Sequence, residues 1–301
     1  MTAVIEAEGL TKYYGPRRGL EDVDLSVAPG EVFGYLGPNG AGKTTTIRLL
    51  LDFIRPTRGR VSVLGENPRT GVAARRRIGY LPGELMFEGR EKVRDLLTFF
   101  ADARGGVPAR RIQDLAERFE LDLSRTIRSL SKGNKQKVGL VQAFMHEPEL
   151  LILDEPTSGL DPLMQQEFLD MVRAARIAGQ TVFMSSHVLA EVQQAADRVG
   201  IVRAGRLVAV EKVESLGKRA VRRVEVHFAT PVVAADFADL RGVSDVHVEG
   251  TVLRCTVDGQ LDALVKALAQ HTVVDLISAE PDLEETFLGY YYDNEESSRV
   301  A

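Results

Sequence analysis

A glycine-rich loop that ends in lysine and threonine carries the residue types best suited to chemistry in this chain. It reads Gly37-Pro38-Asn39-Gly40-Ala41-Gly42-Lys43-Thr44 and is followed by Thr45. Glycines let backbone N–H groups turn inward around a β-phosphate, Lys43 reaches the β- and γ-oxygens, and the Thr44 hydroxyl is a ligand for Mg²⁺. The pattern predicts a nucleotide-binding loop that includes Thr45, with Thr44 at the metal.

The flanks of the loop support this interpretation. Val32 to Leu36 is an apolar run typical of a strand, and after the loop the i, i+3, i+4, i+7 spacing of an amphipathic helix is kept by Ile47, Leu50, Leu51 and Ile54. Such a helix directs the positive end of its dipole at the phosphates. A glycine-rich turn that binds nothing is the alternative, and the strand before the loop and the helix after it argue against that alternative.

Two adjacent carboxylates, Asp154 and Glu155, follow the apolar run Leu150 to Leu153. Because ligands of parallel sheets bind at the carboxyl ends of the strands, we expect both acids beside the metal and the γ-phosphate. Asp154 would hold the metal through a water molecule, and Glu155 would orient and polarise the attacking water. An acidic strand exit on the surface is the alternative for a lone acidic pair, and the phosphate-binding loop upstream argues against it.

Three further motifs indicate which kind of phosphate-loop protein this is. They are Leu130-Ser131-Lys132-Gly133-Asn134, Ser158-Gly159-Leu160-Asp161 and Ser185-Ser186-His187. Together with the loop and the carboxylates, they resemble the motifs of the ATP-binding cassette (ABC) family over about residues 3 to 215. The resemblance implies a signature motif at Ser131, Lys132, Gly133 and Asn134, a D-loop residue at Asp161, and a switch histidine that contacts the γ-phosphate at His187.

The resemblance also implies how the remaining site residues work. Lys43, Glu155 and His187 would be the catalytic set, and Tyr14 would stack on adenine, with Tyr13 as the alternative. As a lone feature, a histidine such as His187 would more often be structural. Its place at the end of a predicted strand, downstream of every other motif, favours the functional role.

Two departures from the family pattern bear on the interpretation. Gly83 and Glu84 stand where ABC ATPases usually carry the Q-loop glutamine, and glycine has no side chain to reach a metal, so Glu84 either takes over or belongs to a solvated loop. The signature has Lys132 in place of a glycine and Asn134 in place of a glutamine. Ser-Lys-Gly variants resemble the ATPase subunits of bacterial drug- and antibiotic-exporting systems of the daunorubicin-resistance type, which also carry an extension.

The resemblance implies an ATP-hydrolysing subunit that powers export of a drug, antibiotic, lipid or similar molecule. In this family ATP binds, with Mg²⁺, between the phosphate loop of one cassette and the signature motif of another. A second copy of the chain in a homodimer, or a paralogous cassette, is therefore expected. A separate integral membrane permease would form the pore and hold the chain, as a peripheral subunit, at the cytoplasmic face of the membrane.

The alternatives are the ATPase of an importer, a soluble ABC-type ATPase acting on ribosomes or DNA, and a binding module that uses ATP only as a switch.

The composition agrees with a soluble globular chain. Of its 301 residues, 44% are hydrophobic and 27% are charged, and the formal charge of −5 is mild, so no nucleic acid partner is expected. A lone cysteine, Cys255, excludes an internal disulfide, and its apolar neighbours predict a buried structural residue. Because no run of about 18 apolar residues occurs, we expect no membrane-spanning helix.

The elements that must position these motifs change in type along the chain. Residues 1–217 alternate β-rich runs with helical patterns, which predicts an α/β P-loop NTPase (ABC ATPase) domain with further strands at Thr181 to Ser185 and Val199 to Val202. Between the loop and the carboxylates, two helical patterns predict a helical subdomain at about 84–145; their apolar positions are Val93, Leu96, Leu97, Phe100, Ile112, Leu115, Ala116 and Phe119.

Residues 218–292 follow a different pattern and predict a small C-terminal α+β accessory domain. Its strands alternate, as at Val224, Val226 and Phe228, and the element order β-α-β-β-α-β is that of a ferredoxin-like fold. We expect short helices near Phe237 and Leu240 and at Leu261 to Leu268, a hairpin across Glu249-Gly250, a strand at Val273 to Ile277, a last helix from Pro281, and a polar tail at 293–301. Its histidines are scattered, which argues against a metal site, so a regulatory or dimer-supporting role is expected.

Overall fold

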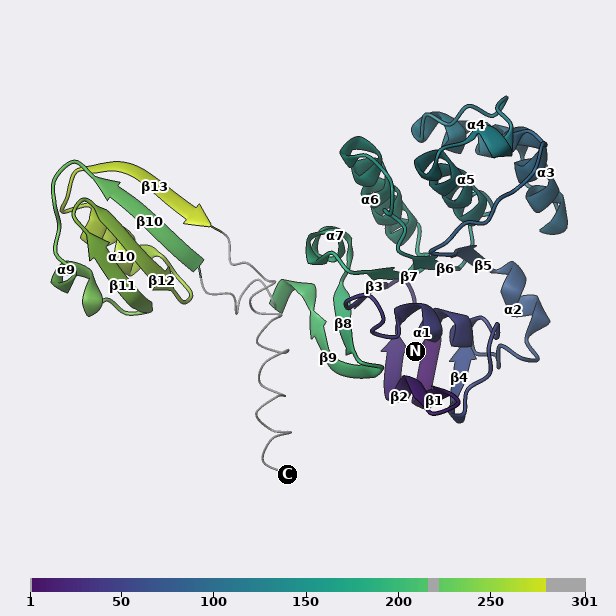
Figure 1. The fold of residues 1–301 in the computed structure, drawn as a ribbon, viewed down its shortest axis with the longest axis horizontal. Coiled ribbons are helices and arrows are strands. Elements are labelled where there is room, and N and C mark those ends of the chain that lie inside the picture. The colour runs from purple at the N-terminus through teal and green to yellow at the C-terminus, as the bar shows by residue number, and fades with distance from the viewer. Residues whose placement is uncertain (1, 216–221, 280–301) are drawn as a thin grey trace. The chain divides into compact units, whose positions relative to one another are not determined.

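The computed structural model describes residues 2–215 and 222–279. The chain divides into two compact units, Met1–Glu211 and Lys212–Ala301 (Figure 1). The predicted domain boundary at Gly217, the predicted last helix from Pro281 and the polar tail at 293–301 lie outside the described residues. Within the described part, the strands of the first unit form a large, mostly parallel sheet and a smaller antiparallel sheet, and those of the second unit form one antiparallel sheet.

The large sheet of the first unit contains all four strands that the sequence predicts there. In spatial order its strands are β5 (Ile78–Leu81), β6 (Leu150–Asp154), β7 (Thr181–Ser186), β3 (Val32–Leu36), β8 (Arg198–Arg203) and β9 (Arg206–Lys212). The neighbours from β5 to β8 pair in parallel. Every residue of β3, β6 and β7 is buried, as expected for parallel strands that are covered on both faces.

The antiparallel sheet of the first unit is an element that the sequence patterns did not predict. Its strands, in order, are β2 (Arg17–Val27), β1 (Ile5–Tyr14) and β4 (Arg58–Val63). The pairing of β1 with β2 shifts register three times, between Ala7 and Leu10, Leu10 and Lys12, and Lys12 and Tyr13. Each shift moves the following side chains to the other face, which breaks the strict alternation by which a strand is found in a sequence.

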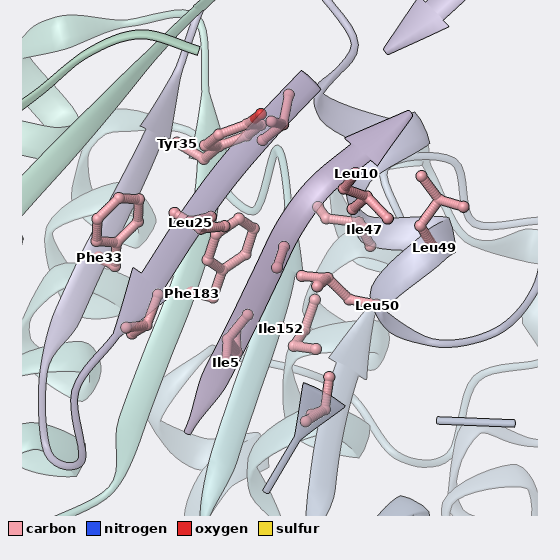
Figure 2. Packing of buried hydrophobic residues seen from close by; sticks show 14 of the residues in the cluster. Ile5, Leu10, Leu25, Phe33, Tyr35, Ile47, Leu49, Leu50, Ile152 and Phe183 are labelled. Atoms are coloured by element: carbon pink, nitrogen blue, oxygen red, sulfur yellow. The ribbon is translucent and has the colours of Figure 1, made fainter. Parts of the chain in front are cut away.

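A shared hydrophobic core joins the two sheets of the first unit through α1 (Lys43–Leu50) (Figure 2). The antiparallel sheet contributes Ile5, Leu10 and Leu25, the parallel sheet Phe33, Tyr35, Ile152 and Phe183, and α1 Ile47, Leu49 and Leu50. The phenol of Tyr35 accepts a hydrogen bond from Thr46 Oγ1 at 3.2 Å, and burial raises the pKa of Tyr35 to about 12. The core therefore fixes the strand and the helix on either side of the glycine-rich loop.

The helix after the loop is shorter than its apolar spacing predicts. Helix α1 ends at Leu50, and Ile54 lies beyond it, partly buried against the same core. Asp52 has a φ of 56°, in the left-handed region, and this backbone conformation ends the helix. The apolar stripe thus continued into a turn that packs on the core without being helical.

Helices cover the opposite face of the large sheet and form a separate group beside it (Figure 1). Helices α6 (Pro162–Ile177) and α7 (Leu189–Ala195) pack on β7 and β3. The predicted helical subdomain contains α3 (Val93–Ala103), α4 (Ala109–Arg118), a 3-10 turn at Ile127–Ser129 and α5 (Lys132–Phe144), and a short α2 (Val72–Arg76) precedes β5.

The second unit has the element order that the sequence predicts. It runs β10 (Arg222–Phe228), α9 (Ala235–Ala238), β11 (Val243–Glu249), β12 (Val252–Val257), α10 (Asp262–Leu268) and β13 (Val273–Ala279). The strands lie in the order β11-β12-β10-β13 and all neighbours are antiparallel, which is the ferredoxin-like arrangement. Cys255 is buried in its core and burial raises the pKa of its thiol, so the predicted structural cysteine is confirmed.

Candidate functional site

The glycine-rich loop connects the end of β3 to the start of α1. Gly42 precedes the helix with a φ of 115°, a conformation that a side chain rarely permits. Gly37 lies so close to the strand next to it that a Cβ atom there would collide with the carbonyl oxygen of Val202. Glycine is therefore needed at both ends of the loop for its backbone to wrap tightly ahead of the helix.

Lys43 is held inside the loop by the backbone and by a carboxylate. Its Nζ donates to the carbonyl oxygens of Gly37 at 2.6 Å and Pro38 at 3.2 Å. It also forms an ion pair with Glu155 Oε1 at 3.0 Å, although the side chain is only 6% exposed. A buried ammonium with three oxygen partners is positioned to exchange them for the oxygens of an anion that enters the loop.

Thr44 and Asp154 meet across the ends of α1 and β6. The Thr44 hydroxyl donates to Asp154 Oδ2 at 2.8 Å, and Asp154 is 1% exposed. A hydroxyl and a carboxylate beside a phosphate-binding loop form the kind of hard oxygen donor set that Mg²⁺ prefers, with water and phosphate completing its shell. The predicted pair is therefore brought together, and its chemistry fits the ion.

Glu155 is the centre of the polar contacts at the mouth of the loop. Its Oε2 lies 2.6 Å from His187 Nδ1, while its Oε1 faces Lys43. Its backbone has a φ of 49°, a left-handed conformation that is uncommon outside glycine, and its N–H donates to Ser185 Oγ at 3.0 Å. Glu155 thus contacts both of the other residues predicted to be catalytic, Lys43 and His187.

A cleft of about 460 Å³ opens over the loop, within the size range of small-molecule sites. Its lining includes Tyr14, Gly19, most of the loop residues and Glu155. Tyr14 is 43% exposed, whereas the phenol of Tyr13 donates to Glu21 Oε1 at 2.8 Å, and this hydrogen bond raises the pKa of Tyr13. Of the two tyrosines considered for adenine, Tyr14 is the one that lines the cleft.

The residues of the predicted signature motif lie at the start of α5, where two of the four are exposed and two are partly buried. Ser131 caps the helix by accepting from Asn134 N at 3.3 Å, and Ser131 and Lys132 are exposed. Gly133 approaches the loop after β6 so closely that a Cβ there would lie 2.5 Å from the oxygen of Gly159. Within the described residues, no signature residue is hydrogen-bonded to the glycine-rich loop of the same chain.

Gln136, on the same helix, is a residue that sequence reasoning missed. It is 3% exposed, and its Nε2 donates to the carbonyl oxygens of Pro156 at 2.9 Å and Glu155 at 3.3 Å. It therefore joins the signature helix to the backbone of Glu155. In the sequence it is one of several polar residues in the first half of the helix, and this position alone does not reveal its partner.

Asp161, predicted to belong to the D-loop, has a structural contact of its own. It caps α6, where its Oδ1 accepts from Met164 N at 3.0 Å and Pro162 occupies the first turn. This loop lies between the carboxylates and α6, so Asp161 is fixed relative to Glu155 by a short, capped segment.

The structure places Gly83, and not Glu84, against the carboxylate of Asp154. A Cβ at Gly83 would lie 3.1 Å from Asp154 Oδ2, which leaves almost no room for a longer side chain without a shift. Glu84 is exposed and lines a separate cavity of about 570 Å³ with Lys132, Lys135 and Gln136. In this conformation Glu84 thus faces the signature helix.

Comparison with known proteins agrees with this geometry. The family model described as ABC transporter matches residues 20–158. A bacitracin transport ATP-binding protein of Bacillus licheniformis is 33% identical over 298 residues, which cover 96% of this chain and 97% of the relative. A daunorubicin resistance ATP-binding protein of Streptomyces coeruleorubidus is 36% identical over 299 residues, covering 94% of each. The chain belongs to the ABC transporter family.

A solved structure supports the same assignment. The structure of an ATP-binding subunit of an ABC transporter is 34% identical, with a TM-score of 0.66, and covers 71% of this chain and 91% of that one. As an ABC transporter ATPase, the chain binds ATP and hydrolyses it. None of the helices in the described part is both long enough and apolar enough to span a bilayer.

Proposed function

We propose that this ABC ATPase powers the export of a drug, antibiotic, lipid or similar molecule through a separate membrane permease. The observation that carries the ATPase part is the contact of Glu155 with both Lys43 and His187 over the phosphate-binding loop. The export part is supported by the two relatives named above, whose similarity extends over at least 94% of the chain and so includes the second unit.

In this proposal the phosphates of ATP bind in the loop and the adenine stacks on Tyr14. Residues 37–42, with Thr45, offer backbone and side-chain groups to the phosphates, at the N-terminus of α1 where the helix dipole favours negative charge. The γ-phosphate competes with Glu155 for Lys43, because both are anions that pair with the same buried ammonium. ATP binding would thereby release the Glu155 carboxylate for chemistry.

Hydrolysis is an in-line attack of water on the γ-phosphorus. Glu155 accepts a proton as the water oxygen attacks, and the bond from phosphorus to the bridging oxygen breaks, so that ADP and phosphate are the products. Lys43 offsets the negative charge that develops on the phosphate oxygens. His187, in contact with Glu155 Oε2, is placed to orient that carboxylate and to contact the γ-phosphate once Glu155 has turned to water.

Thr44 and Asp154 are the residues that would hold Mg²⁺, as their oxygen donors suggest. When bound, the ion neutralises charge on the β- and γ-phosphate oxygens. The hydroxyl of Thr44 donates a hydrogen bond to the Oδ2 atom of Asp154, so the two side chains that would hold the ion already lie together.

We further propose that the complete ATP site needs a second cassette, most simply a second copy of the chain. The signature residues Ser131 to Asn134 are at a helix start that is exposed to solvent and is not hydrogen-bonded to the chain's own loop, as far as the described residues go. The free backbone N–H groups at the N-terminus of a helix bind anions, so this helix start could bind the γ-phosphate held by another subunit. ATP would then stabilise the closed dimer, because its contacts with both subunits exist only there.

The permease partner and the membrane location belong to the same proposal. The relatives are named as ATP-binding proteins of transport and resistance systems, which supports a division of labour with a separate pore protein. The chain would bind that protein at the cytoplasmic face of the membrane as a peripheral subunit. No part of this proposal involves nucleic acid.

The direction of transport can be measured once the membrane subunit is identified. The tagged chain is isolated from its native membrane, the co-purifying integral membrane protein is identified, and both are expressed in cells from which inside-out vesicles are prepared. Export predicts ATP-dependent accumulation of a transported probe, with daunorubicin and bacitracin tested first, and none with the Lys43→Ala variant. Accumulation only in right-side-out vesicles would show an importer. A chain that binds ATP without releasing phosphate would instead be a switch.

A further inference from the structure

Two adjacent serines at the end of β7 differ in what they contact. Ser185 and Ser186 are both buried, at 0% and 1% exposure. Ser185 Oγ donates to Asp154 Oδ1 at 2.6 Å and accepts from Glu155 N at 3.0 Å. Ser186 Oγ instead donates to Glu191 Oε2 at 2.7 Å and accepts from Val188 N at 3.0 Å. One serine thus joins the two carboxylate residues, and its neighbour closes the following turn.

The contacts of Ser185 use its hydroxyl in both directions. A serine hydroxyl has one hydrogen to donate and lone pairs to accept, and here the hydrogen goes to Asp154 while a lone pair receives the Glu155 N–H. Thr44 donates to the other oxygen of Asp154. The Asp154 carboxylate is therefore held from both sides, which fixes the rotation of its plane.

The hydrogen bond from Glu155 N to Ser185 Oγ matters because the backbone of Glu155 is strained. A non-glycine residue in the left-handed region, here at a φ of 49°, stays there only when its surroundings determine the conformation. Ser185 holds the N–H of Glu155 and Gln136 holds its carbonyl oxygen, so the peptide groups on both sides of the strained Cα are fixed. The direction of the Glu155 side chain follows from that backbone.

We propose that Ser185 is a positioning residue that sets the Asp154 carboxylate for the metal and the Glu155 backbone for attack on ATP. The proposal rests on the ATPase mechanism given above. Ser185 acts through Asp154 and Glu155, because its own side chain does not reach the cleft. Ser185 is fully buried and is not among the residues that line the cleft.

The test compares Ser185→Ala with Ser186→Ala in the full-length chain. Both changes remove one buried hydroxyl from the same strand end, so their effects on folding are matched. Loss of a group that orients a metal-binding carboxylate typically lowers metal affinity or activity by about 10- to 100-fold. We expect Ser185→Ala to lower kcat by that factor with a KM for ATP close to wild type, while Ser186→Ala retains kcat.

A second readout does not depend on hydrolysis. Binding of Mn²⁺ to the protein saturated with ADP is followed by electron paramagnetic resonance, and we expect about 10-fold weaker Mn²⁺ binding in Ser185→Ala but not in Ser186→Ala. If Ser185→Ala fails to fold, Ser185→Cys replaces it, since a thiol fills similar space but is a weak donor. Equal kcat and equal Mn²⁺ affinity in the two serine variants would overturn the proposal. A wild-type chain without ATPase activity would contradict the proposed function, whereas the Mn²⁺ measurement would still decide the role of Ser185.

Discussion

The two units of the chain each contain an ion pair between a basic side chain and a glutamate, and the two pairs have different surroundings. In the first unit, Lys43 and Glu155 form an ion pair at 3.0 Å, with the lysine 6% exposed and bound to loop carbonyls beside a cleft. In the second, Arg254 and Glu225 pair at 2.9 Å, with the side chains 55% and 32% exposed on the open face of a sheet. The first pair has space beside it for a competing anion, and the second is screened by water.

The hydrogen bonds around the carboxylates differ in the same way. Asp154 receives two hydroxyl hydrogens, from Thr44 and Ser185, which fix its direction. Glu225 is hydrogen-bonded to the exposed side chains of Arg254 and His227, and these contacts lower its pKa. The two hydroxyl donors to Asp154 come from the start of α1 and the end of β7 and fix the direction of this carboxylate, whereas the partners of Glu225 are exposed side chains on its own sheet.

Removing the cation from each pair is the strongest test of this contrast. Lys43→Ala should lower ATP turnover by about 1000-fold or more, since a cation at the transferred phosphate contributes on that scale, and it should weaken nucleotide binding as well. Arg254→Ala, the matched change in the second unit, should leave turnover unaltered. Phosphate release under steady state measures both. Near-normal turnover in Lys43→Ala would remove the distinction between the two pairs.

The next largest effect concerns the acid of the first pair. Glu155→Gln keeps size and hydrogen bonding but cannot take the proton, so turnover should fall by at least about 100-fold. ATP should then remain between Lys43 of one subunit and Ser131 of the other. Light scattering should give a dimer with ATP and Mg²⁺, and a monomer with ADP. A monomer under both conditions would mean that closure needs the permease or a paralogous cassette.

A change in the core of the second unit tests whether that unit is independent of the ATP chemistry. Phe237 is fully buried and its ring lies 5.9 Å from that of Phe228. Phe237→Ala should lower the free energy of unfolding of this unit by about 3 to 5 kcal/mol. Calorimetry should show one transition moving and the other not, with phosphate release unchanged. A parallel loss of turnover would show that the units depend on each other.

Acid should affect the two units in different pH ranges. Burial and the adjacent Arg104 guanidinium lower the pKa of His146 from 6.5 to about 4. Between those values the unfolded chain binds a proton that the folded chain does not, so the first unit loses stability as pH falls from about 6.5 to about 4. Glu225, whose pKa is lowered from 4.5 by the hydrogen bond from Arg254, stabilises the second unit above pH 4.5 and loses that contribution only in stronger acid.

Calorimetry across this pH range can separate the two effects. His146→Gln keeps an acceptor for Arg104 Nη1, which lies 2.8 Å from His146 Nε2, but does not titrate. The slope of stability against pH between about 4 and 6.5 should therefore become smaller in this variant. An unchanged slope would assign the acid sensitivity of the first unit to other groups.

The sequence predicted those parts of the fold whose side-chain pattern is uniform. Buried parallel strands read as continuous apolar runs, so β3 was found at its observed bounds and β6 within one residue. The antiparallel sheet was missed because register shifts in β1 interrupt its alternation. Helix α1 was predicted too long because the turn at Asp52 keeps an apolar residue, Ile54, on the core.

The residues of the site also divide into those that the sequence predicts and those that it does not. Residues within contiguous motifs, such as Lys43 and Glu155, could be identified because each motif is local in the chain. The contacts of Ser185, although it belongs to such a motif, and of Gln136 could not be predicted, because their partners lie between 19 and 31 residues away in the chain. Only the folded backbone shows which donor meets which acceptor. The proximity of Gly83 to Asp154 was hidden for the same reason.

The left-handed backbone of Glu155 has a consequence for how this position can change in evolution. Glycine, and to a lesser degree asparagine, adopts such a φ without the cost that glutamate bears. The glutamate that we propose as the general base is thus not the residue type that the local backbone prefers. Selection for turnover and selection for folding oppose each other here, and descendants of this chain that no longer need hydrolysis should drift to glycine at this position.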